Sequence, residues 1–275
     1  MKYCYRFSNK LQNIDEADEI KIIYEGQVNA LIDFISRHQA TQITLVIKNY
    51  EKFLRENEIA PLRDILSENN IKLCFDELRR ATSLPRDIVD TLPDLFPIQF
   101  YFNHTIASWE MLHYYLNLGA SEVYISEQLG FELPAVRALC SRYGVNIRAF
   151  PNVAQCESNF TDPLQRFFIR PEDLELYSQY IDIFEFWGPD DRQAIFRRIY
   201  ERKKWGGDLS EIISSLDCRL DSPRLVSDWG GARVNCKRAC LAGKSCHICQ
   251  RIANISHKLE KENLFIRQRK SFDFS

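Results

Sequence analysis

The feature that most constrains the fold is an alternation of short strand-like runs with longer helical patterns. Runs rich in β-branched and aromatic residues lie at 20–25, 43–49, 71–76, 98–103, 122–127, 146–150 and 181–187, with 2–7 as a candidate eighth. Helical patterns lie at 28–37, 62–68, 86–92, 109–118, 133–143, 171–180 and 190–204. This alternation predicts parallel βαβ units. Seven or eight units in roughly 210 residues favour a TIM-like (β/α) barrel.

A doubly wound open sheet is the alternative α/β architecture. No G-x-G-x-x-G motif opens any helical pattern, so a dinucleotide-binding version of that fold has no support. The strand runs are mostly apolar on both faces, as expected of parallel strands covered by helices. Two helix boundaries carry local signals, because Ser108 is a predicted N-cap and Gly144 a predicted C-cap.

The chain changes in composition near residue 216. Residues 1–216 carry the alternation and are predicted to form the barrel domain, whereas 217–275 begin irregularly and hold a cluster of cysteines. A helix is expected from about 246 to 262. We expect residues 217–275 to form a cysteine-rich flap that closes over the barrel. Because so short a segment cannot bury a core of its own, a bound metal is expected to hold it together.

The compartment decides how the cysteines are interpreted. No apolar run approaches the ~20 residues needed to cross a bilayer, and the N-terminus lacks the apolar core and cleavage site of a signal peptide. We therefore expect a cytoplasmic protein with no membrane partner. In a reducing compartment, clustered cysteines are more often metal ligands or redox groups than disulfides.

Four cysteines form the most specific motif, with the spacing C-x3-C-x5-C-x2-C. They are Cys236, Cys240, Cys246 and Cys249. Zinc ribbons usually join two C-x2-C pairs through a long loop, whereas the central gap here is five residues. Compressed spacing is more common around [4Fe–4S] clusters, which one loop can wrap. We favour an iron–sulfur cluster, with zinc as the main alternative and unpaired thiols or disulfides as lesser ones.

Cys156 is a fifth candidate ligand, because it follows a predicted strand. Loops after the strands of a barrel converge on its catalytic face, where this thiol could meet the flap. Alternatively, Cys156 is a small buried hydrophobe. The second interpretation is preferred for the remaining cysteines, which are Cys4, Cys74, Cys140 and Cys218.

Charge is unevenly distributed along the chain. The formal net charge is -2, yet residues 233–270 hold ten Lys/Arg and two Glu, a local charge of +8. A basic tail on an acidic body favours an anionic partner. That partner is nucleic acid, a phosphorylated ligand or the thiolate cluster itself.

Polar residues at strand ends are the candidates for the barrel mouth. They are Glu25, Asn49, Asp76, Asn103, His104, Glu127, Asn152 and Glu185. His104 and Asn152 rank first as catalytic residues, because histidine transfers protons and Asn152 lies near Cys156 in the sequence. Glu127 and Glu185 could serve as an acid–base pair. Each could instead cap a helix.

Arg170 is a further candidate, because it precedes a helix N-terminus and could bind a carboxylate with both guanidinium edges. A surface charge at that helix end is the other interpretation. No H-E-x-x-H or G-x-S-x-G motif is present, so no protease arrangement stands out.

Three segments resemble peptidase family U-32, the collagenase-like proteins. The segment 119–129 is similar to a family strand that ends in Ser-Arg-Glu-Leu, and 145–156 to one that leads into His-Gly-Ala-Leu-Cys. Residues 168–174 and 181–188 resemble the family's Leu-Ser-Pro-Lys-Asp-Leu helix and its following Phe-Lys-Ile-Glu-Gly-Arg strand. The resemblance implies a (β/α) barrel with a cysteine-bound [4Fe–4S] cluster, in which Cys156 matches the first cluster cysteine.

The resemblance also implies oxygen-independent hydroxylation of ubiquinone precursors or RNA bases, with prephenate as the oxygen donor. The chain departs from the family pattern at three places. Asn152 replaces a histidine, Glu127 and Gln128 replace an Arg-Glu pair, and the cysteine expected soon after Cys156 is absent. The C-terminal cysteines would then supply the remaining ligands, one more than a four-ligand cluster needs.

Three functions follow from these features. The first is an iron–sulfur enzyme that hydroxylates or otherwise modifies a small aromatic molecule or an RNA base. The second is a zinc-stapled nucleic-acid-binding protein with the basic tail as its binding surface. The third is a non-catalytic partner protein of a larger U-32-like enzyme.

Overall fold

The computed structural model describes most of residues 1–216 and two positions beyond them. The described residues are 2–7, 18–24, 32–33, 42–55, 60–76, 84, 86–130, 132–153, 168–214, 231 and 234. The predicted flap and its helix therefore lie almost entirely outside the described residues. Most of the predicted helix 28–37 does so as well.

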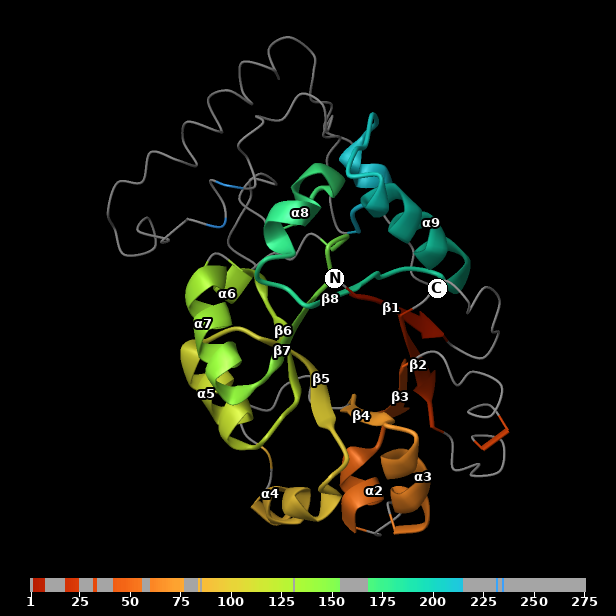
Figure 1. Cartoon of the computed structure of the whole chain (residues 1–275), viewed down its shortest axis with the longest axis vertical. Helices are drawn as coiled ribbons and strands as arrows, with labels where there is room; N and C mark the ends of the chain where they lie inside the picture. Colours follow the sequence, from red (N-terminus) through yellow and green to blue (C-terminus); the bar gives the residue numbers. More distant parts are fainter. Residues whose placement is uncertain are drawn as a thin grey trace.

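Eight strands of the described chain are all parallel and close into a barrel (Figure 1). They are β1 (Lys2–Phe7), β2 (Glu19–Ile23), β3 (Gln42–Ile47), β4 (Lys72–Phe75), β5 (Phe100–Ile106), β6 (Glu122–Ile125), β7 (Asn146–Ala149) and β8 (Ile183–Glu185). Each strand pairs with the next in sequence, and β8 pairs with β1. The predicted α/β barrel is confirmed in this part of the chain, with 2–7 as the eighth strand. Closure excludes the open-sheet alternative.

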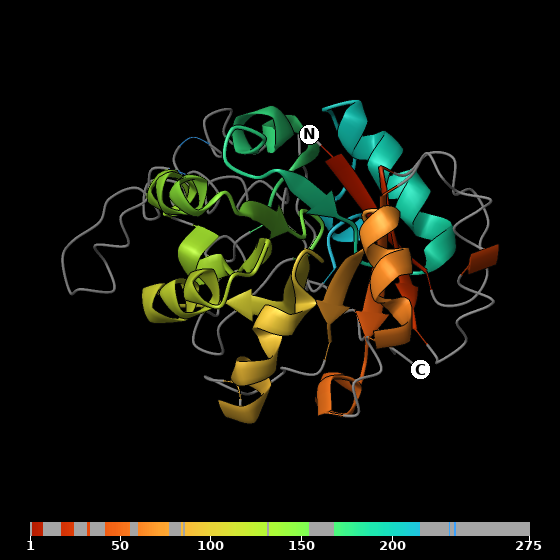
Figure 2. The same cartoon turned by 60° about the horizontal axis from the view of Figure 1, so that its bottom comes forward.

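Helices lie outside the ring of strands (Figure 2). They are α2 (Tyr50–Arg55), α3 (Arg63–Glu68), α4 (Arg86–Thr91), α5 (Trp109–Asn117), α6 (Glu127–Gly130), α7 (Leu133–Tyr143), α8 (Leu174–Tyr177) and α9 (Asp190–Glu201). Short 3-10 turns complete several connections: η2 (Ala60–Leu62), η3 (Leu92–Leu95), η5 (Pro171–Asp173) and η6 (Leu209–Glu211). Among the described helices, α2 and α6 are the two that the sequence pattern did not predict. None of them is long and apolar enough to cross a membrane.

Two predicted helix boundaries are confirmed at atomic detail. The Ser108 hydroxyl accepts a hydrogen bond from the Met111 amide, which is the bond an N-cap makes. Gly144 ends α7 with a left-handed φ of 68°. This conformation favours glycine, because a Cβ would crowd the backbone there.

The strands have two different faces because alternate side chains point to opposite sides. Outward residues form one large apolar cluster with the helices; Phe102, for example, packs on Tyr115 of α5 with 5.2 Å between ring centroids. Inward residues enter the lumen of the barrel. The expectation that both faces are apolar is wrong for the lumen, where six charged side chains are buried.

The chain beyond β8 returns across the ends of β7 and β8. Tyr200 on α9 is fully buried, and its hydroxyl lies 3.2 Å from the carbonyl oxygen of Pro151 and 2.8 Å from that of Ile169. Further along, the Ser214 amide donates to the Asn152 carbonyl at 2.7 Å, and Ser214 forms a parallel bridge with Val153. The start of the C-terminal region is thereby fixed beside the end of β7.

Candidate active site

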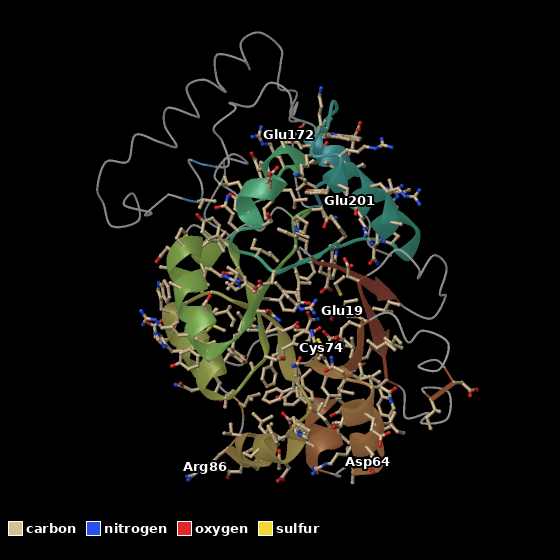
Figure 3. All side chains as sticks on the ribbon, in the orientation of Figure 1. Glu19, Asp64, Cys74, Arg86, Glu172 and Glu201 are labelled. Carbon is tan, nitrogen blue, oxygen red and sulfur yellow. The ribbon has the colours of Figure 1, made fainter. Side chains whose placement is uncertain are left out.

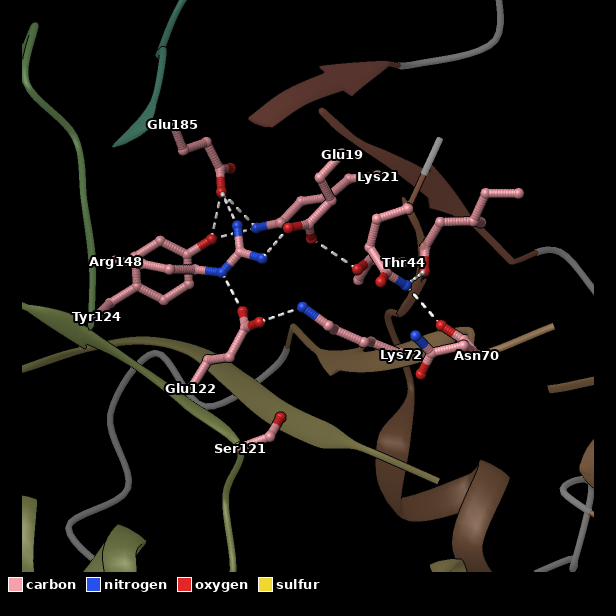
Figure 4. Close-up of polar contacts among 12 residues, drawn as sticks. Glu19, Lys21, Thr44, Asn70, Lys72, Ser121, Glu122, Tyr124, Arg148 and Glu185 are labelled. Atoms are coloured by element: carbon pink, nitrogen blue, oxygen red, sulfur yellow. Dashed lines mark hydrogen bonds and ion pairs between the residues drawn. The ribbon is translucent and has the colours of Figure 1, made fainter. Parts of the chain in front are cut away.

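The lumen holds a network of ionic side chains centred on Arg148 of β7 (Figure 4). The Arg148 guanidinium donates through Nη2 to Glu19 of β2 and through Nε to Glu122 of β6. Its Nη1 lies 3.6 Å from Oε2 of Glu185. Arg148 thus joins three carboxylates that come from three different strands.

Two lysines complete the network. Lys21 Nζ lies 2.6 Å from Glu185 Oε2 and also donates to the hydroxyl of Tyr124, which in turn donates to Glu185. Lys72 pairs with Glu122. Three buried acids are therefore balanced by three buried bases: Glu19, Glu122 and Glu185 against Lys21, Lys72 and Arg148. Figure 3 places Glu19 and Cys74 in the centre of the barrel.

Mutual attraction favours the charged forms of Glu19 and Lys21 despite their burial. Burial alone would raise the pKa of Glu19, but the charges of Arg148 and Lys72 and hydrogen bonds from Arg148 and Thr44 lower it to about 2. Burial likewise opposes protonation of Lys21, yet the Glu185 carboxylate leaves the Lys21 pKa above its ordinary value. Buried ions are tolerated only when paired in this way.

The same environment keeps the neighbouring hydroxyls and thiols protonated. Burial, reinforced by Glu185, raises the pKa of Tyr124 well above its ordinary value. Burial raises the pKa of the Cys74 thiol to about 11, and it raises the pKa of Cys4 well above its ordinary value. The interpretation of Cys4, Cys74 and Cys140 as small buried residues is confirmed.

Above the lumen, the strand ends form the barrel mouth. The ring of Phe150 stacks on Tyr124, with centroids 5.2 Å apart and planes inclined by 13°. Trp187 meets Phe150 edge-on at 5.9 Å and is 41% exposed. On the opposite strands, the Asn103 amide donates to the Asp76 carboxylate. The mouth therefore offers an aromatic surface and an oriented carboxylate.

The structure gives Asn152 and Arg170 internal partners. The side chain of Asn152 donates to the Trp187 carbonyl at 2.7 Å and accepts from the Trp187 amide at 2.9 Å. Arg170 makes the two-edged carboxylate contact expected of it, but with Asp173, at 2.6 and 2.8 Å. Asn152 therefore braces the mouth, whereas Arg170 forms a local ion pair at the start of η5.

Other predicted mouth residues are dispersed. His104 lies against Tyr115 of α5, at 6.5 Å between ring centroids, and partial burial lowers its pKa. Asn49 accepts from the Lys52 amide and so caps α2. Glu185 points into the lumen. Glu127 begins α6 but its side chain is outside the described residues, as is Glu25.

All five predicted metal ligands also lie outside the described residues: Cys156, Cys236, Cys240, Cys246 and Cys249. Within the described residues, no group of three or more His, Cys, Asp or Glu side chains could hold a metal. Two described residues lie close in sequence to these cysteines. Val153 pairs with Ser214, and Val234, which is buried in the main apolar cluster, lies two residues before Cys236.

Sequence reasoning missed most of the lumen network. A usable signal existed, because Glu19 and Lys21 alternate with apolar residues in one strand and Arg148 interrupts another. Charges at alternate positions of a buried parallel strand point to one shared face. The aromatic pair Phe150 and Trp187 was also missed, although each is the last residue of a predicted strand run.

Comparison with known proteins does not assign the chain to a family. No family model matches the sequence, and no curated protein is significantly similar to it.

Proposed function

We propose that this chain is an iron–sulfur protein of the U-32-like type that modifies a small aromatic molecule or an RNA base. In this proposal Cys156 and the C-terminal cysteines bind a [4Fe–4S] cluster at the barrel mouth. Four of the five thiols Cys156, Cys236, Cys240, Cys246 and Cys249 would serve as ligands. The reaction class is oxygen-independent hydroxylation or a related modification.

The pairing of Val153 with Ser214 is the observation that carries this proposal. Cys156 follows Val153 by three residues, so its Cα lies within about 11 Å of that of Val153. Cys236 follows the buried Val234 by two residues and lies within about 7 Å of it. The two chain segments that carry the candidate ligands are thus tethered to the same barrel, one of them beside the mouth.

The chemistry of the mouth supports an aromatic substrate. Aromatic side chains offer stacking faces to planar ligands. Trp187 is partly exposed there, with Phe150 packed beneath it on Tyr124. Asp76, held by Asn103, could accept a hydrogen bond from a ring hydroxyl or amino group. A bound cluster would supply electron transfer.

Anaerobic purification of the full chain tests the metal assignment. We expect a brown protein with about four iron atoms and acid-labile sulfide per chain, and broad absorbance near about 400 nm. Separate Cys→Ala changes at the five positions should lower the iron content for four of them. Cys140→Ala is the matched control, because Cys140 is buried in α7. A colourless protein with stoichiometric zinc would instead support the zinc-stapled alternative.

A further inference from the structure

The outer face of α9 carries a concentration of positive charge. Residues 190–204, which include all of α9, hold six Lys/Arg and three Asp/Glu, a local charge of +3. Arg192, Arg198 and Arg202 are all exposed. At 3.6 residues per turn they fall within an arc of about 120° and span about 15 Å along the helix axis. They therefore form one basic row.

The orientation of this row is fixed by the opposite face of the helix. Phe196 and Tyr200 of α9 are buried, and Tyr200 is hydrogen-bonded to the chain that follows β7. A Cβ added to Gly188 would lie 2.9 Å from the Phe196 ring, which shows how closely the start of this segment packs. The basic row consequently lies on the solvent-exposed side of α9, and α9 itself lies outside the ring of strands (Figure 2).

Part of the positive charge is compensated within the fold. Arg197 pairs with Glu201 at 2.8 Å, and Lys203 with Glu175 at 2.7 Å. Within the part of the chain that the structure describes, no ion pair joins Arg192, Arg202 or Lys204 to a carboxylate. The surface therefore keeps an excess of cations for an external anion.

An aromatic side chain stands at the start of the same segment. Trp187 precedes Arg192 by five residues and is 41% exposed, while its main chain is held by Asn152. Arginines beside an exposed aromatic ring are typical of surfaces that bind single-stranded nucleic acid, where phosphates meet the cations and a base stacks on the ring. A membrane surface is less well matched, because Ile195 is the main exposed apolar residue of α9 and interfacial helices need a broad apolar face.

We propose that α9 and Trp187 form a binding surface for single-stranded nucleic acid. Arg192 and Arg202 contact phosphates, and Trp187 stacks on one base. Phosphate contacts carry no sequence information, so the surface binds with little sequence preference. The inference does not depend on the metal centre proposed above, although it shares Trp187 with the aromatic surface that we assigned to the substrate there.

Fluorescence anisotropy with a labelled single-stranded RNA of mixed sequence tests the row of arginines. The full chain should bind, with affinity that falls steeply between about 50 and 200 mM salt. The variant Arg192→Gln/Arg202→Gln should bind on the order of tenfold more weakly at moderate salt. Its slope of log K against log salt should be smaller by about 1.4, the value for two lost phosphate contacts on a single strand.

The matched control is Arg86→Gln/Arg142→Gln, which removes the same charge from exposed positions on α4 and α7. Arg86 lies at the end of the molecule opposite α9 (Figure 3). This control should change the slope by much less than one. Equal effects of the two double variants would overturn the proposal, as would no RNA binding at low salt.

A second pair of variants tests the stacking residue. Trp187→Ala should weaken binding about tenfold, whereas Trp187→Phe should retain most of the affinity because phenylalanine still stacks. If both variants bound RNA as tightly as the wild type, the proposed role of Trp187 would be wrong. Tighter binding to anionic phospholipid vesicles than to RNA would replace nucleic acid with a membrane surface. Iron content is measured on the same samples, so failure here is distinct from failure of the metal assignment.

Discussion

Arg148 is the residue on which the polar lumen most depends, because it contacts acids from three strands. Removing one member of a buried ion pair leaves an uncompensated charge and costs about 3–5 kcal/mol. Replacing a whole buried network by apolar residues is often neutral. Loss of any one of the six charged side chains should therefore destabilise the protein, whereas the barrel architecture itself could form without any of them.

Because Glu19 belongs to this network, the stability of the protein should depend on pH. Its folded pKa of about 2 lies below the ~4.3 of an unfolded glutamate, so folding favours the carboxylate. The resulting stabilisation, on the order of 3 kcal/mol, is present above about pH 4.5 and is lost as the pH falls toward 2. Urea unfolding across this range should show the loss. Glu19→Gln should abolish that part of the acid dependence and destabilise the protein at neutral pH.

The control for this prediction is Glu68→Gln on α3, an exposed position with the same change of charge. It should leave both the stability at neutral pH and its acid dependence nearly unchanged. If the two variants had the same stability and acid dependence, the stabilising role assigned to the buried ion pairs of Glu19 would be wrong.

Asn152 supports a second prediction at this scale. Asn152→Ala removes both side-chain hydrogen bonds to the Trp187 main chain and leaves its partly buried amide and carbonyl without these partners. We expect a loss of about 2–4 kcal/mol in the free energy of unfolding. Asn152→Asp should also destabilise, because a carboxylate would face the Trp187 carbonyl oxygen. Urea denaturation checks both, and wild-type stability in either variant would refute the bracing role.

The predictions for single residues show what a sequence can resolve. Strand ends were placed well enough to find Asp76, Asn103 and Asn152 near the mouth. Which side of the barrel wall a side chain faces was not resolved, since a shift of one residue reverses it. Glu185, which was expected at the mouth, instead points into the lumen. His104 proved to face α5, in a strand whose register with β6 is interrupted.

At the scale of elements, prediction succeeded because its signals are local. Periodicity and caps located α5, α7 and most strands within a few residues, and Gly144 was identified from its position alone. The six-residue helix α2 was missed, because so short a helix offers little periodicity to detect. The pairing of β8 with β1 joins distant parts of the chain, so the local pattern could only favour closure.

Gly144 allows the C-cap of α7 to be tested in isolation. Apart from the adjacent main chain, a Cβ at this position would meet no atom within 4 Å, so the cost of Gly144→Ala comes from the positive φ alone. We expect a loss of about 1 kcal/mol in the free energy of unfolding. Gly144→Asn should cost less, because asparagine tolerates the left-handed conformation. Equal losses in the two variants, measured by urea denaturation, would point to a cause other than φ.

At the scale of the whole molecule, the barrel and the chain that follows it meet at the end of β7. The loop toward Cys156 leaves from Val153, and the C-terminal region leaves from Ser214 beside it. Two segments far apart in sequence therefore start from one place on the barrel. The contact therefore fixes where both segments leave the barrel.

Ser214→Pro tests whether this contact supports the proposed metal centre. Proline removes the amide that donates to the Asn152 carbonyl at 2.7 Å, whereas Ser214→Ala keeps that amide and serves as the control. We expect Ser214→Pro to keep the circular dichroism and cooperative unfolding of the barrel but to lose most of the iron found in wild type. Ser214→Ala should retain it. Full iron occupancy in a folded Ser214→Pro protein would show that the cysteines assemble without this contact.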